Sequence, residues 1–308
     1  MSKKLLYLIG ILAVIILGII FSLKYCCCPL CGAEATPVSN ENEKLITKEV
    51  YKEPTLYPFS VKDGQGDLSL QINDNFNFEE SNLNFLKPIS SNLDMQIDKL
   101  KDYLTSNDNK SLSITGFFTA NEKNNSAFPN LGIARANSVK NYFESKGIPS
   151  KIMNTFGQEK NGMVADSLKV YHGPVNFNIL EFKDDSDEIA KLGEYIKANP
   201  IVLNFKTGQA HINLTAAERQ EIADIAKYLD KVEGATCIVT GHTDNTGDAT
   251  VNMKLGQDRA DFAKQYLVRN AIPASKITAI SKGQTEPIAD NNTDEGKAKN
   301  RRTVITIK

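Results

Sequence analysis

Apolar side chains in the second half of the chain recur with the spacing of strands and of helices in turn. Thr215 and Glu218 have the spacing of a capping box, which marks the start of a helix. The apolar runs that predict strands are residues 201–205, 236–241, 277–280 and 303–307, and those that predict helices are residues 214–229 and 253–268. Strands that alternate with helices of this length predict an α/β sandwich, with the helices packed on one sheet.

The first half of the chain carries the same pattern 124 positions earlier. Thr119, Leu131, Arg135, Tyr142 and Pro149 recur as Thr243, Leu255, Arg259, Tyr266 and Pro273. Residues 175–179 likewise resemble residues 303–307. A repeat this long indicates two domains in tandem, each a two-layer α/β sandwich of the βαβαβ type, and not a solenoid.

An uncharged apolar run occupies residues 5–23, close to the N-terminus. At 1.5 Å per residue, a helix of this length crosses the hydrocarbon core of a bilayer, and the run is longer than that of a usual cleaved signal. Lys3 and Lys4 favour an N-inside orientation, although Lys24 weakens this signal. We therefore expect residues 1–25 to be a single-pass membrane anchor. The alternative is a lipoprotein signal, although Lys24 and Tyr25 before Cys26 lack the small residues of that motif.

Four of the five cysteines, Cys26, Cys27, Cys28 and Cys31, follow this run directly. Cys28 and Cys31 have the spacing of a redox or metal pair, but no second pair lies nearby and the three histidines are scattered, so we expect no metal site. Disulfides between protomers and acylation remain alternatives for the cluster. Cys237 lies in an apolar run and is expected to be a buried small hydrophobe.

Composition narrows the class of partner. The chain has 36 basic and 37 acidic side chains and a net charge of −1, which predicts no nucleic-acid partner. Trp is absent, so a binding site built on stacked indoles is excluded. Residues 26–57 hold the cysteine cluster and then a charged stretch without periodicity, which indicates a linker between the membrane and the folded part.

Four motifs stand in order in the second half of the chain. They are Thr243-Asp244-x-x-Gly247, Asn252-x-x-Leu255-x-x-x-Arg259-Ala260, Gly283-x-x-Glu286-Pro287 and Asn300-Arg301-Arg302. Over about residues 200–308 they resemble the OmpA-like C-terminal domain family, which includes peptidoglycan-associated lipoproteins and flagellar stator subunits of the MotB kind. The resemblance implies two OmpA-like domains, a degenerate one over residues 58–183 and a complete one over residues 184–308. The sequence departs from the family at Gly256, where Ser is more usual, and this is expected to soften the start of the helix.

The resemblance implies that the second domain binds the diaminopimelate of peptidoglycan. A guanidinium group meets a carboxylate with two hydrogen bonds, and a carboxylate meets an ammonium group. Asp244 ends a strand and Arg259 lies on the next helix, where a crossover brings them side by side. By resemblance these two residues hold the ligand, and Thr243, Asn252 and Leu255 line the same loop and helix start, with Asn252 fixing the loop. The plain alternative is a surface salt bridge, which contributes little by itself. A structural role is expected for both Arg301 and Arg302. The alternative is that one pairs internally with an acidic residue and the other supports the ligand carboxylate.

The first domain differs in the charged positions. In the alignment of the two halves, Ala120 stands where Asp244 stands, whereas Arg135 is kept. Glu122 is a candidate for the missing carboxylate, a point that the residues alone leave open. We expect residues 58–183 to be a spacer or a domain that contacts another protein.

The leading hypothesis is a protein of the bacterial cell envelope that binds peptidoglycan without catalysis and tethers a membrane to the wall. Its domains then lie in the periplasm, with the inner membrane favoured and the outer membrane as the alternative. A second hypothesis is a stator-like or transport-complex subunit, but residues 5–23 lack the acidic residue that carries ions. No catalytic constellation and no cofactor motif is found, and Asp184 and Asp185 belong to a solvated hinge.

Overall fold

The computed structural model describes residues 52–204 and 214–308. The chain divides into two compact units, Met1–Val50 and Tyr51–Lys308, and the described residues all belong to the second. The expected anchor and the cysteine cluster therefore lie outside the described residues. Within residues 52–204 and 214–308, no helix combines the length and the apolar character that crossing a membrane requires.

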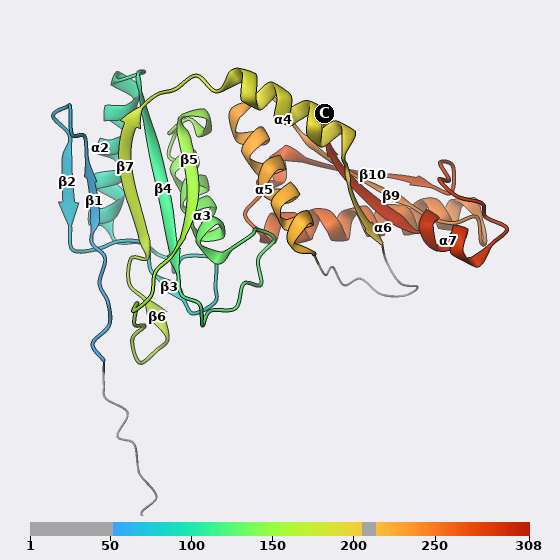
Figure 1. Ribbon diagram of the computed structural model, residues 1–308, viewed down its shortest axis with the longest axis horizontal. Helices are drawn as coiled ribbons and strands as arrows, with labels where there is room; N and C mark the ends of the chain where they lie inside the picture. Colours follow the sequence, from blue (N-terminus) through green and yellow to red (C-terminus); the bar gives the residue numbers. More distant parts are fainter. Residues whose placement is uncertain (1–51, 205–213) are drawn as a thin grey trace, which may run out of the picture. The chain divides into compact units, whose positions relative to one another are not determined.

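Strands and α-helices alternate strictly from β7 onward, whereas in the first half β1 to β3 and β5 to β7 follow one another without an α-helix between them (Figure 1). The strands are β1 (Phe59–Lys62), β2 (Ser69–Ile72), β3 (Phe78–Glu79), β4 (Lys110–Phe118), β5 (Met153–Glu159), β6 (Val170–Tyr171), β7 (Val175–Glu181), β8 (Ile201–Asn204), β9 (Cys237–His242), β10 (Ile277–Gly283) and β11 (Arg302–Ile307). The helices are α2 (Ser91–Ser106), α3 (Leu131–Ser145), α4 (Ser186–Ala198), α5 (Ala216–Lys231), α6 (Ala249–Arg269) and α7 (Asp294–Asn300), with 3₁₀ turns at Ser150–Ile152 and Ala274–Lys276.

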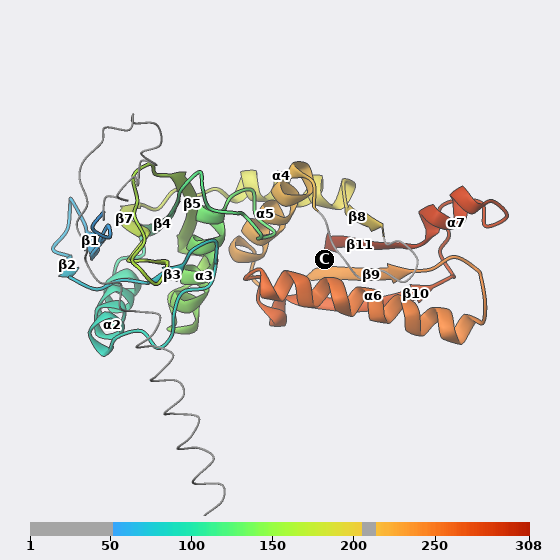
Figure 2. The same cartoon turned by 90° about the horizontal axis from the view of Figure 1, so that it is seen from below.

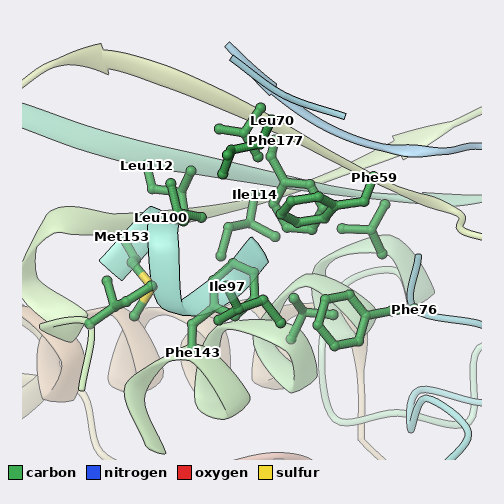
Figure 3. Close-up of a cluster of buried hydrophobic side chains, with 14 of the residues drawn as sticks. Phe59, Leu70, Phe76, Ile97, Leu100, Leu112, Ile114, Phe143, Met153 and Phe177 are labelled. Carbon is green, nitrogen blue, oxygen red and sulfur yellow. The ribbon is translucent and has the colours of Figure 1, made fainter. Parts of the chain in front are cut away.

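The elements from β1 to β7 form what we call the N-terminal lobe. Its central strand β4 pairs in parallel with β5, which it reaches through α3, and antiparallel with β7. Helices α2 and α3 lie on the same side of this sheet (Figure 2). In β7 every second residue points inward, so Val175 and Phe177 enter the core while Asn176 stays exposed. Leu, Ile and Val side chains fill this core together with aromatic rings that contact one another, among them Phe59, Phe76, Phe143 and Phe177 (Figure 3).

The elements from α4 to β11 form the C-terminal lobe. Strand β9 is central, pairing in parallel with β10, which it reaches through α6, and antiparallel with β11, which also pairs with β8. Helix α6 runs along β9 and β10 (Figure 2). The expected capping box is present at the start of α5, where the Thr215 hydroxyl accepts from the backbone N–H of Glu218 and the Glu218 carboxylate accepts from that of Thr215.

The predicted elements of this lobe form with shifted ends. Helix α6 begins at Ala249, four residues before the predicted start, because the Asp248 carboxylate caps it by accepting from the backbone N–H groups of Thr250 and Val251. Helix α4 was not predicted, although Ile189 and Ile196 of its inner face are buried. Cys237 is fully buried in the core as expected, and burial raises the pKa of its thiol to about 12.

The two sheets share the order strand, helix, parallel strand. In the sequence the two halves match 124 positions apart, but most of the paired positions of their central strands β4 and β9 are 125 apart. Gly116 of β4 pairs with Gly157, and Gly241 of β9 pairs with Ser281, so these strand positions are 125 residues apart. The partner positions 157 and 281 are 124 apart. The offset returns to 124 at the strand ends, where Phe118 pairs with Glu159 and, after a register shift in β10, His242 pairs with Gly283. The placement of Ala120 opposite Asp244 stays a prediction.

Contacts between the lobes include buried polar groups. The Lys140 ammonium group of α3 pairs with the Asp230 carboxylate of α5, and both side chains are almost fully buried. The backbone N–H of Ala127 donates to the Asn270 side chain over 2.8 Å. Phe128 is fully buried and packs in the core of the C-terminal lobe. The N-terminal and C-terminal lobes thus contact each other, consistent with their membership of one compact unit.

Candidate functional site

The predicted site residues lie where β9 passes into α6. Thr243 and Asp244 follow β9 directly, Asn252 and Leu255 stand in the first two turns of α6, and Arg259 lies one turn further along. The helix folds back along the strand that precedes it, and this crossover places the loop beside the helix start. The structure thus brings together residues that the motif spreads over 17 positions.

The Asp244 carboxylate is nearly buried and pairs with Arg301. Its Oδ2 accepts from the Arg301 Nη1 over 2.8 Å, and its Oδ1 accepts from the backbone N–H of Thr246 over 3.0 Å. Burial alone would raise the pKa of Asp244, but the hydrogen bonds from Arg301 and Thr246 hold it below its usual value. Asp244 is therefore ionised at neutral pH, and Arg301, rather than Arg259, is its direct partner.

The Arg259 guanidinium is half-buried and largely unpaired. Its Nη1 donates to the backbone carbonyl of His242 over 3.1 Å, which ties α6 to the end of β9. Burial lowers its pKa, the charge of Arg301 lowers it further, and the Asp244 charge acts in the opposite direction. Within residues 52–204 and 214–308, its other N–H groups have no hydrogen-bond partner. The group feels the charge of the Asp244 carboxylate but forms no ion pair with it.

The other predicted site residues differ in what they contact. The buried Asn252 side chain donates to the Thr246 carbonyl over 3.1 Å and to the Gln284 side chain over 2.6 Å, so it ties together the loops after β9 and β10. The Thr243 side chain is buried, whereas 40% of the Leu255 surface is exposed. Leu255 therefore offers an apolar contact at the rim of the site.

Several buried polar atoms around Asp244 lack a partner. They are the His242 Nδ1, the Thr243 Oγ1 and the Arg301 Nε. The His242 ring is neutral, because burial, followed by the charge of Arg302, lowers its pKa to about 4. Buried polar groups normally have partners, so these three atoms are exceptions among the residues that the structure describes.

The sequence left open which of Arg301 and Arg302 pairs with an acidic residue, and the structure shows that Arg301 does. The residues before β11 lie beside the end of β9 because the two strands are antiparallel, with Thr303 next to Gly241. Arg302, by contrast, is buried and donates to the Glu286 carbonyl over 3.1 Å, which is the expected structural role. No group of three or more potential metal ligands occurs in the part of the chain that the structure describes.

The family of this chain follows from its match to a sequence profile. The sequence profile of the OmpA family matches residues 75–169 and 204–301, together more than half of the chain.

The chain belongs to the OmpA family.

Three similar proteins match different shares of this chain. The peptidoglycan-associated lipoprotein of Buchnera aphidicola subsp. Baizongia pistaciae is 33% identical over 163 residues, which are 53% of this chain and 85% of that protein. Outer membrane porin F of Pseudomonas fluorescens is 38% identical over 28% of this chain and 27% of its own length. The peptidoglycan-binding protein ArfA of Mycobacterium tuberculosis is 34% identical over 32% of this chain and 31% of its own. This chain thus spans most of the lipoprotein but less than a third of the other two.

A solved structure in the same group is the cell wall anchor of the T6SS from Pseudomonas aeruginosa. It is 32% identical, covers 39% of this chain and 95% of its own, and has a TM-score of 0.29. That score is too low to add to the family assignment, which rests on the sequence match.

Proposed function

We propose that this protein binds peptidoglycan without catalysis and tethers a membrane to the cell wall, with diaminopimelate held between Asp244 and Arg259. The observation that carries the proposal is the open Arg259 guanidinium beside an ionised carboxylate. Two relatives are named for association with peptidoglycan or binding to it. Several others are named as outer membrane proteins, which supports a place in the cell envelope.

The chemistry of diaminopimelate suits these two groups. Its side chain ends in a carboxylate and an ammonium on one carbon atom. The free N–H groups of Arg259 can bind the carboxylate bidentately. The Asp244 carboxylate accepts one bond on each oxygen, from Thr246 and Arg301, and each oxygen has a second lone pair. An ammonium group can therefore bind Asp244 without displacing Arg301.

The proposal includes the order of the parts along the chain. We propose an anchor over residues 1–25 and a linker over residues 26–57, followed by two OmpA-like domains over residues 58–183 and 184–308. Two separate matches to the family profile support the tandem arrangement. The periplasm then holds both domains, with the second engaging the wall.

Sedimentation with isolated sacculi tests the site. Asp244→Ala and Arg259→Ala should each weaken binding of the full chain by about 2–5 kcal/mol, because each leaves one charge of the ligand without its partner. Arg269→Ala is the matched control, since this exposed residue of the same helix lies at its far end. Undiminished sedimentation of both site variants would contradict the proposal.

Cell walls that differ in their stem peptides test whether the protein recognises diaminopimelate. Sacculi in which lysine replaces diaminopimelate keep the ammonium group and lose the carboxylate that we assign to Arg259. We expect these sacculi to bind weakly, and stem peptides that contain diaminopimelate to compete with the natural wall where stem peptides that contain lysine do not. Equal binding to both kinds of wall would exclude diaminopimelate recognition while leaving general wall binding in place.

A further inference from the structure

Arg135, the counterpart of Arg259 in the N-terminal lobe, is fully buried, and each of its five N–H groups has a partner. Its Nη1 donates to the Phe117 carbonyl over 2.8 Å and to the Glu122 Oε2 over 3.2 Å. Its Nη2 donates to the Glu122 Oε1 over 2.5 Å and to the Glu79 carbonyl over 3.3 Å. Its Nε donates to the Asn82 carbonyl over 3.1 Å. No donor of this guanidinium is left for another molecule.

One of these bonds has an equivalent in the C-terminal lobe. Arg135 bonds to the carbonyl of Phe117 as Arg259 bonds to that of His242, and these strand residues are 125 positions apart, the offset of most paired positions of β4 and β9. The remaining partners differ. In the N-terminal lobe the chain surrounds the guanidinium, whereas Arg259 has free donors among the residues that the structure describes.

Glu122, like Arg135, is fully enclosed and hydrogen-bonded within the lobe. Its side chain is fully buried, with Oε1 accepting from the backbone N–H of Ser81 and Oε2 from that of Thr119. The rings of Phe78 and Tyr171 lie 5.2 and 5.6 Å from the guanidinium carbon. The aromatic faces thus stabilise the guanidinium cation, and the backbone N–H groups hold the carboxylate, as they would hold a bound anion.

We infer that Glu122 is an internal ligand, whose carboxylate occupies the place on Arg135 that an external carboxylate would take, so that the N-terminal lobe holds a carboxylate site closed by its own chain. Removing the Glu122 side chain opens this site to small carboxylates. The comparison with Arg259 rests on the proposed function, whereas the occupancy of Arg135 is independent of it.

This inference answers the question that the sequence left open about Glu122. The glutamate does supply a carboxylate to Arg135, but it does so inside the lobe and not at a surface that a stem peptide reaches. The two lobes then differ in function. Among the described residues of these two sites, Arg259 in the C-terminal lobe keeps free N–H groups, whereas Arg135 in the N-terminal lobe has none. The N-terminal lobe then contributes no wall binding of its own.

The test is chemical rescue of Glu122→Ala in the full chain, with thermal unfolding measured in sodium acetate and in sodium chloride of equal concentration. A ligand that binds only the folded state raises the unfolding temperature. We expect the variant to unfold several degrees higher in about 100 mM acetate than in chloride. The wild-type protein and an Arg135→Met/Glu122→Leu double variant should show no such difference. An equal response of all three proteins overturns the inference.

A second variant keeps the test decisive if Glu122→Ala does not fold in either salt. Glu122→Gln preserves the shape of the side chain but places an amide NH₂ against guanidinium donors. It should lower the unfolding temperature by several degrees, whereas Asp98→Asn, at an exposed ion pair with Lys101, should leave it unchanged. A Glu122→Gln protein as stable as the wild type contradicts the inference. These measurements use no sacculi, so their failure is distinguishable from failure of the proposed wall binding.

Discussion

At the scale of single residues, three arginines near Asp244 have three different roles. Arg301 pairs with the carboxylate, Arg259 keeps free donors, and Arg302 is buried against backbone carbonyls. With Asp244 these groups give the site more positive than negative charge, which favours a ligand that brings carboxylates. The role of each guanidinium follows from what surrounds it, because an identical side chain is available to a ligand only where the chain leaves its N–H groups unpaired.

Arg301 should influence wall binding through the ionisation of Asp244. Arg301→Gln removes a hydrogen bond that lowers the pKa of Asp244, so the carboxylate should take up its proton at higher pH. The protonated acid no longer attracts an ammonium group. As pH falls from about 7 to about 4, the variant should therefore release sacculi at a higher pH than the wild-type protein does.

Arg269→Gln is the control for this prediction, since it removes the same charge from an exposed position. Binding should be recorded as a function of pH at constant ionic strength. Identical pH profiles for Arg301→Gln and the wild type would show that Arg301 does not set the ionisation of Asp244.

At the scale of elements, a contact between two glycines sets how closely α6 approaches β9. A Cβ atom on Gly241 would lie 1.8 Å from the Gly256 carbonyl oxygen, and one on Gly256 would lie 2.3 Å from the Ser281 Oγ. Helix α6 continues through Gly256 without interruption. The departure from the usual Ser therefore does not soften the helix. It allows the backbones to approach closely, and this approach brings Arg259 within reach of the His242 carbonyl.

The two glycines should respond differently to substitution. Gly241→Ala meets a backbone atom that cannot rotate away and should cost about 1–3 kcal/mol of the free energy of unfolding, or more. Gly256→Ala meets the end of a small side chain first and should cost less. Denaturant unfolding measures both. Gly64→Ala is the control, because no atom lies within 4 Å of the added Cβ. A Gly256→Ala variant less stable than Gly241→Ala would contradict this packing.

At the scale of the whole molecule, a buried ion pair joins the two lobes. Burial lowers the pKa of Lys140, whereas Asp230 opposes that effect by stabilising the ammonium form. Asp230 also lies 3.4 Å from the Lys276 ammonium group, which in turn pairs with Glu144 over 3.2 Å. A pair of this kind is costly to break, because the partner that remains is buried without a counter-charge.

Asp230→Asn should therefore destabilise the protein by about 3–5 kcal/mol, since it leaves Lys140 buried without its anion. The double variant Lys140→Met/Asp230→Leu replaces both charges with apolar groups and should be close to the wild type in stability. Lys276 keeps its pairing with Glu144 in both variants. Denaturant unfolding at neutral pH gives the two free energies. A double variant less stable than Asp230→Asn would show that the pair itself, and not its burial, stabilises the contact.

Much of the architecture could be predicted from local patterns in the sequence. Apolar spacing predicted the four strands of the C-terminal lobe and its helices α5 and α6 to within a few residues, but not α4 or α7. Thr215 with Glu218 predicted the capped start of α5. The apolar neighbours of Cys237 predicted its burial. These features depend on residues a few positions apart, and the periods of strand and helix encode them directly. The motif around Asp244 and Arg259 likewise indicated the OmpA family before any contact was known.

Tertiary structure alone decided which charges meet. Asp244 pairs with Arg301, 57 positions away, because β11 is antiparallel to β9 and begins beside the loop that follows β9. Glu122 fills the shell of Arg135 because the loop after β4 folds back, where the backbone N–H groups of Ser81 and Thr119 hold its carboxylate. Register and loop length change neither the apolar period nor the motif, so the sequence cannot reveal them by pattern. They determine which arginine is enclosed by its own chain and which one is left open to a ligand.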